Sequence, residues 1–165
     1  MNSTPIWASN SRRRGDADAS TTLAERLAHV LRPGDVLLLS GPVGAGKTHF
    51  ARALIRAWLA QAGLVDDIPS PTFTLVQTYT RPDGALWHAD LYRLSGPYEV
   101  QELGLEDAFE TAICLVEWPD RLGPYTPPRH ILVQLDQGAD DDLRDLKFTC
   151  AGPNWGHVLP ILAAL

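Results

Sequence analysis

The sequence predicts an α/β protein built in three layers, with a mostly parallel central sheet that antiparallel strands extend. The apolar run at residues 36–39 is bounded by turn residues, as is typical of a strand buried on both faces of a parallel sheet. A glycine-rich segment, residues 41–48, follows it directly, and apolar residues at helical spacing come next. A second apolar run, residues 113–116, predicts another buried strand.

The N-terminal region is expected to hold a tail and a first helix. Residues 1–17 are polar and lack periodicity, and the Arg12–Arg14 run within them is typical of a solvated, flexible tail. From residue 20 onward, apolar residues recur at helical spacing. A helix is therefore predicted over roughly residues 20–31, with Ser20 as its N-cap and Pro33-Gly34 as its stop signal.

The middle of the chain predicts a helix and a hairpin. The helix that follows the glycine-rich segment is expected to end at Gly63. Segments 72–80 and 85–92 are rich in β-branched and aromatic residues and flank the turn at 81–84. They are expected to pair as an antiparallel hairpin.

The C-terminal part predicts short elements of both kinds. Short helical pieces are expected at 97–110, before the buried strand at 113–116. Strands near 130–136 and 143–150, joined by an acidic turn at 138–142, precede a helix from about Trp155. With no internal repeat, residues 18–165 are expected to form a single domain.

Composition indicates an ordinary globular protein. The chain has 165 residues, of which 45% are hydrophobic and 21% charged, enough to bury a core without disulfides. No apolar run approaches the roughly 18 residues of a membrane span, so we expect a cytoplasmic protein. Cys114 and Cys150 lack metal-ligand or redox spacing, so both are expected to be reduced core residues.

The charge balance bears on the partners of the protein. The net charge is -6 and the isoelectric point is near 5.2. Clustered lysines and arginines supply most non-specific affinity for nucleic acids, and this chain does not have that balance. Any contact with RNA is therefore expected to be indirect, through a partner.

A phosphate-binding loop is the strongest motif in the sequence. Residues 41–48 fit G-x-x-x-x-G-K-[ST] in full, between a predicted strand and a predicted helix. Gly44 and Gly46, on either side of Ala45, allow the tight path by which backbone amides converge on phosphate oxygens. Lys47 is expected to reach the β- and γ-phosphates, and Thr48 to ligate Mg²⁺. The fold is thus predicted to be a three-layer P-loop NTPase fold; the glycine order disfavours a dinucleotide-binding fold.

The nucleotide is expected to be ATP. The Asn-Lys-x-Asp motif usual in guanine-selective P-loop proteins is absent, because no asparagine here precedes a lysine. Hydrolysis needs an acid for Mg²⁺ and a residue that orients water. Glu117, at the end of the strand at 113–116, is the first candidate for the metal, and Asp90 could hold metal-bound water or the attacking water. A surface carboxylate is the alternative reading for either acid alone.

Four blocks occur in an order that resembles one family. They are residues 44–48 (GAGKT), 70–76 (SPTFTLV), 88–94 (HADLYRL) and 114–119 (CLVEWP). Together they resemble the TsaE (YjeE-like) family, over about residues 18–136. The loop alone is shared by a superfamily, whereas the other three blocks are specific.

The resemblance implies a function. Members of this family are P-loop ATPases that act with the TsaB and TsaD proteins in attaching threonylcarbamoyl to the adenosine beside the anticodon of tRNAs reading codons that begin with A. They hydrolyse ATP weakly alone and more strongly in the complex. The resemblance therefore implies ATP and Mg²⁺ as cofactors, TsaB-like and TsaD-like partners, and only an indirect contact with tRNA.

The resemblance also implies roles for single residues. Lys47 and Thr48 keep the roles given above, Glu117 matches the metal-binding glutamate, and Asp90 matches an acid implicated in hydrolysis. Thr72 falls in a switch-like loop that senses the γ-phosphate. Two further residues match less closely: Ser20 aligns loosely with a threonine near the adenine, and His49, which replaces Thr or Ser, could contact the α-phosphate or lie on the helix surface.

Two other functions remain open from the sequence. A small-molecule kinase would use the same loop, but such kinases usually carry closely spaced lid arginines, and here only Arg121, Arg129 and Arg144 follow Trp118. A non-hydrolysing ATP sensor would couple nucleotide and partner through differential binding. Intact Asp90, Thr72 and Glu117 argue against the sensor without excluding it.

Overall fold

The computed structural model describes residues 7–15, 17–71, 74–137 and 144–164. In these ranges seven strands form one sheet, in the order β1-β7-β6-β2-β5-β4-β3. The strands are β1 (Trp7–Gly15), β2 (Val36–Ser40), β3 (Val76–Arg81), β4 (Gly84–Asp90), β5 (Ile113–Glu117), β6 (His130–Gln137) and β7 (Arg144–Ala151). The helices are α1 (Ala17–Ala28), α2 (Lys47–Ala60), α3 (Glu99–Glu102), α4 (Leu105–Thr111), the 3₁₀ helix η1 (Pro119–Tyr125) and α5 (Leu159–Ala163).

The sheet has a parallel centre and antiparallel edges. Strand β2 pairs in parallel with β5 and β6, and β5 pairs in parallel with β4. Strand β3 adds to β4 in the antiparallel sense, as do β7 to β6 and β1 to β7. The predicted sheet, with its mostly parallel centre extended by antiparallel strands, is confirmed.

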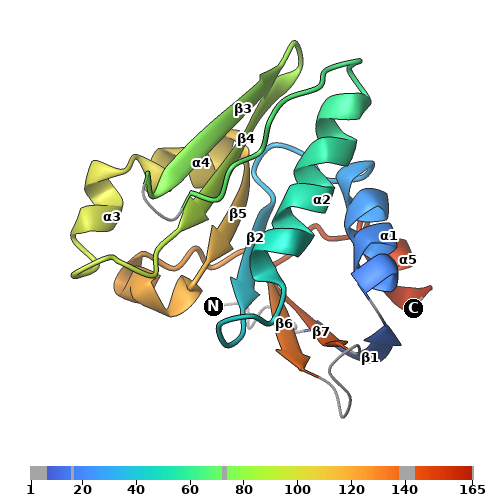
Figure 1. Cartoon of the computed structure of the whole chain (residues 1–165). Coiled ribbons are helices and arrows are strands. Elements are labelled where there is room, and N and C mark those ends of the chain that lie inside the picture. The colour runs from blue at the N-terminus through green and yellow to red at the C-terminus, as the bar shows by residue number, and fades with distance from the viewer. Residues whose placement is uncertain (1–6, 16, 72–73, 138–143, 165) are drawn as a thin grey trace.

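Helices cover both faces of the sheet (Figure 1). The side chains of α1, α2 and α5 share one hydrophobic cluster with the sheet, and those of α3, α4 and η1 share another. On β2, Leu37 and Leu39 belong to the first cluster and Leu38 to the second. Because successive side chains of a strand point to opposite faces, β2 is buried on both, and the three-layer prediction is confirmed.

The N-terminal region differs from the expectation. Residues 7–15, which were expected to belong to a flexible tail, form β1, paired antiparallel with β7 at the edge of the sheet. Edge pairing rests on backbone hydrogen bonds, so it needs no apolar alternation in the sequence. Helix α1 begins at Ala17, consistent with the high helix propensity of alanine, so Ser20 lies inside the helix and is not its N-cap.

The hairpin and the C-terminal helix are shorter than expected. Strands β3 and β4 pair antiparallel, with Arg81 opposite Gly84, and β4 also joins the parallel centre through β5. Helix α5 begins at Leu159 and not near Trp155, because residues 156–158 form a turn before it; Trp155 Nε1 donates to the Ala151 carbonyl at 3.0 Å. The acidic turn expected at 138–142 lies outside the described residues.

Two smaller expectations were also tested. Cys114 and Cys150 are free and buried, and burial raises the pKa of their thiols, to about 12 and about 11. Both are thus free core residues, consistent with the prediction, and the raised pKa of their thiols makes them poor nucleophiles. Among the helices in the described ranges, none has the length and apolar character that crossing a membrane requires.

Candidate functional site

The phosphate-binding loop connects β2 to α2. Gly41 has φ 150° and lies against a neighbouring strand: a Cβ there would clash with the Leu135 carbonyl oxygen of β6. Gly46 adopts φ 100° at the N-cap of α2, a conformation that glycine adopts without strain. The loop therefore packs closely against β6 and leads directly into α2.

The N-terminus of α2 is a ready anion site. The first amides of a helix have no intrahelical acceptor, and its dipole favours negative charge there. In the form described, the Ala45 amide donates to the Pro42 carbonyl at 3.1 Å. A cavity of about 420 Å³ opens over the loop, lined also by Asp90 and Tyr92 and by Glu117 and Trp118.

Lys47 lies buried in the first turn of α2. Its Nζ donates to the carbonyl oxygens of Gly41 and Pro42, at 2.5 and 2.8 Å, and lies 4.2 Å from the ring centroid of Trp118. Burial lowers the pKa of the ammonium group, and the carboxylates of Glu117 and Asp90 partly offset that effect. The lysine is thus held against its own loop by groups that phosphate oxygens can replace.

The two predicted metal ligands meet directly. Thr48 Oγ1, in the first turn of α2, donates to Glu117 Oε1 at the end of β5, at 2.7 Å. Glu117 is buried, with 2% of its surface exposed. A hydroxyl and a carboxylate are the oxygen donors that Mg²⁺ prefers, and it takes its other ligands from water and phosphates. The pair fits such a site, and the described residues contain no larger cluster of metal-ligating side chains.

Asp90 lies beside Glu117 because β4 and β5 pair in parallel, with these two residues opposite each other. It is buried, and its Oδ1 accepts a hydrogen bond from the Tyr92 amide at 3.1 Å. The cavity over the loop thus brings together the two acids, Lys47 and Thr48. Glu117 lies at the end of its strand, as the sequence predicted.

His88 is a site residue that the sequence reasoning missed. Its ring is fully buried, and Nε2 lies 2.6 Å from Glu117 Oε2. The signal was present: His88 and Asp90 are two residues apart on one strand, so their side chains share a face. The alternation of side chains along this strand places His88 on a buried face, and a buried histidine needs a polar partner.

Trp118 follows Glu117 with a left-handed backbone, φ 57°, which is unusual for a bulky residue. Its ring lies 4.9 Å from that of Tyr92, between centroids, and carries the Lys47 ammonium on its face. Trp118 therefore forms one side of the cavity over the loop. Phosphates bound there would attract the Lys47 ammonium and draw it away from the ring.

This contact predicts a fluorescence signal. Adding MgATP is expected to change the tryptophan emission, and Trp118→Phe is expected to lose most of that change. Trp155→Phe is the matched control, since Trp155 also stacks on a cation, Arg129, but outside the cavity over the loop. Equal signals from the Trp118→Phe variant and the unmodified chain in a fluorescence titration would contradict the assignment.

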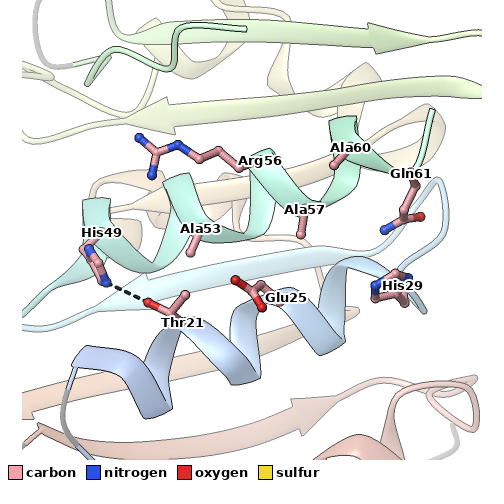
Figure 2. A pocket seen from close by; sticks show the side chains of 9 residues that line it. All are labelled: Thr21, Glu25, His29, His49, Ala53, Arg56, Ala57, Ala60 and Gln61. Atoms are coloured by element: carbon pink, nitrogen blue, oxygen red, sulfur yellow. Dashed lines mark hydrogen bonds between the residues drawn. The ribbon is translucent and has the colours of Figure 1, made fainter. Parts of the chain in front are cut away.

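The remaining predicted residues are placed differently. A second cavity, of about 540 Å³, lies between α1 and α2, where Ala53 and Ala57 face α1 (Figure 2). His49 lines both cavities, and its Nε2 is 3.0 Å from Thr21 Oγ1. Ser20 is buried inside α1 and lines neither of these two cavities, whereas its neighbour Thr21 lines the second and contacts His49 at the start of α2. Thr72 lies outside the described residues.

Together, the glycine loop between a buried strand and a helix, the lysine at its end and the acids on the neighbouring strands define a P-loop NTPase fold. The family model described as "Threonylcarbamoyl adenosine biosynthesis protein TsaE" matches residues 15–146. The chain therefore belongs to the TsaE family, and the resemblance seen in the sequence is confirmed.

Individual relatives support the same family assignment. The chain is 42% identical to the tRNA threonylcarbamoyladenosine biosynthesis protein TsaE of Rickettsia felis, over 69% of this chain and 65% of that protein's length. It is 32% identical to the protein of the same name from Bacillus subtilis, over 82% of each chain. The crystal structure of Bacillus subtilis YdiB is similar over 98% of both chains, with a TM-score of 0.77 and 26% identity.

Proposed function

We propose that this chain is the ATP-binding and hydrolysing subunit required for threonylcarbamoylation of the adenosine beside the anticodon of tRNAs that read A-starting codons. It would act in complex with TsaB-like and TsaD-like proteins and contact tRNA only through that complex. Alone, it would hydrolyse ATP weakly. The observation that supports this most is the 2.7 Å contact of Thr48 with Glu117, next to Lys47 and Asp90.

The proposed reaction is attack of water on the γ-phosphorus. The bond to the β–γ bridging oxygen breaks, which gives ADP and phosphate with release of a proton. Asp90 would orient the water, and Lys47 would offset charge on the β- and γ-phosphates. Thr48 and Glu117 would hold Mg²⁺, which when bound offsets the negative charge of the phosphates. Thr72 is proposed to sense the γ-phosphate, and amides from Gly44, Ala45 and Gly46 to bind phosphate oxygens.

The kinase alternative gains no support from the arginines. Arg129 Nη1 donates to Asp35 Oδ1 at 2.9 Å, and its other nitrogens donate to the carbonyls of Pro153 and Asn154. The guanidinium of Arg129 is therefore occupied by Asp35 and by the segment before α5. Arg121 lies 3.9 Å from Asp120 and is partly exposed.

The proposal is tested by ATPase activity measured with and without TsaB-like and TsaD-like proteins from the same organism. We expect slow release of phosphate by the chain alone and a clear increase with both partners present. ATP binding with no hydrolysis in either case would favour the sensor. Failure to bind adenine nucleotide in the presence of Mg²⁺ would overturn the proposal.

A further inference from the structure

The inference concerns His88, and it rests on the proposed function, in which Glu117 is a metal ligand. His88 lies on β4 two residues before Asp90, and β4 pairs with β5 so that Asp90 is opposite Glu117. The His88 ring therefore reaches Glu117 diagonally, on the face of the sheet that packs against α2. Leu86, two residues earlier, belongs to the core on that same face.

The burial of His88 indicates a specific partner. The ring has no exposed surface, and a buried polar group costs free energy unless it is hydrogen-bonded. Its Nε2 lies 2.6 Å from Glu117 Oε2, while Nδ1 has no hydrogen-bond partner among the described residues. An N–H at Nε2 can donate to a carboxylate oxygen, so this contact satisfies the buried ring at one of its two nitrogens. The one polar interaction described for this ring is thus directed at Glu117.

The two oxygens of Glu117 have separate partners. Oε2 lies 2.6 Å from His88 Nε2, and Oε1 accepts from Thr48 Oγ1. A carboxylate held at one oxygen cannot rotate freely, so the other oxygen stays directed at Thr48. We propose that His88 is a positioning residue: it fixes the rotamer of Glu117 and thereby the metal affinity of the nucleotide site. Outer partners of this kind commonly change metal affinity 10–100-fold.

The test compares two replacements of His88. His88→Leu removes the donor and keeps the volume close, whereas His88→Gln keeps an N–H donor at a similar reach. ADP binding is titrated by calorimetry at a series of Mg²⁺ concentrations and in EDTA, and Mn²⁺ binding to the ADP complex is followed by electron paramagnetic resonance. We expect His88→Leu to need at least about 10-fold more metal, with ADP affinity in EDTA unchanged, and His88→Gln to recover most of the loss.

Leu86→Ala is the matched control, because it creates a cavity on the same strand and face. It is expected to lower the midpoint of thermal unfolding and leave the Mg²⁺ dependence unchanged. If His88→Leu does not fold, His88→Asn replaces it, since its amide is too short to reach Glu117.

The outcomes separate this inference from the proposed function. An unmodified chain whose ADP binding ignores Mg²⁺ would contradict the proposed metal site itself. An unmodified chain that responds to Mg²⁺, with His88→Leu or His88→Asn responding at the same concentrations, would overturn the role of His88 alone. A His88→Gln variant that needs as much Mg²⁺ as His88→Leu would also overturn the role of His88.

Discussion

Lys47→Ala is expected to weaken ATP binding by about 10- to 100-fold, because the lysine supplies a charge-assisted hydrogen bond to phosphate worth roughly 1.5–3 kcal/mol. Binding is measured by calorimetry with MgATP. In the structure Nζ donates to two carbonyls of its own loop, and bound phosphates would take the place of these acceptors.

The chain offers a matched control for this variant. Lys147, the only other lysine, is exposed on β7, and Lys147→Ala is expected to leave ATP affinity unchanged. Circular dichroism would confirm that both variants fold. A Lys47→Ala protein that binds MgATP within about threefold of the unmodified chain would contradict the role of the loop, since threefold is below 1 kcal/mol.

Asp90→Ala is expected to lower the partner-stimulated rate of ATP hydrolysis by about 10²–10⁴-fold, the range typical of a lost acid–base or water-orienting group. ATP affinity should change little, because Lys47, Thr48 and the loop amides remain. The measurement is phosphate release in the presence of both partner proteins, with ATP binding followed in parallel.

Asp83 supplies the comparison for Asp90. It lies in the turn of the same hairpin, where it pairs with Arg81 at the surface. Asp83→Ala is expected to hydrolyse ATP at the normal rate. An Asp90→Ala variant that keeps the normal stimulated rate would refute the catalytic role of this acid and return the water-orienting role to Glu117 or to a residue outside the described ranges.

Local patterns predicted most of the central sheet. The apolar runs at 36–39 and 113–116 became β2 and β5, and the loop between β2 and α2 follows its motif. These features depend on residues close in sequence, where alternation, glycine conformation and helix periodicity act directly. Strand β1 escaped prediction because its pairing partner, β7, lies more than a hundred residues away.

The candidate site shows the same division. The motif identified Lys47 and Thr48, and the strand end identified Glu117, so the chemical groups were predictable. The pairing of Thr48 with Glu117 and the packing of Lys47 on Trp118 were not, because they depend on how α2 lies over the ends of the strands. His88 was quoted within a motif, yet its role became visible only with the register of β4 on β5.

By itself, the amino-acid sequence determined the class of fold and the family and named the candidate groups for a nucleotide site, because these follow from short motifs and their spacing. Only the tertiary structure decided which oxygen of Glu117 faces His88 and which faces Thr48. The reason is physical: hydrogen bonds act over about 3 Å, and residues far apart in the chain reach that range only once parallel pairing has set the register of the strands.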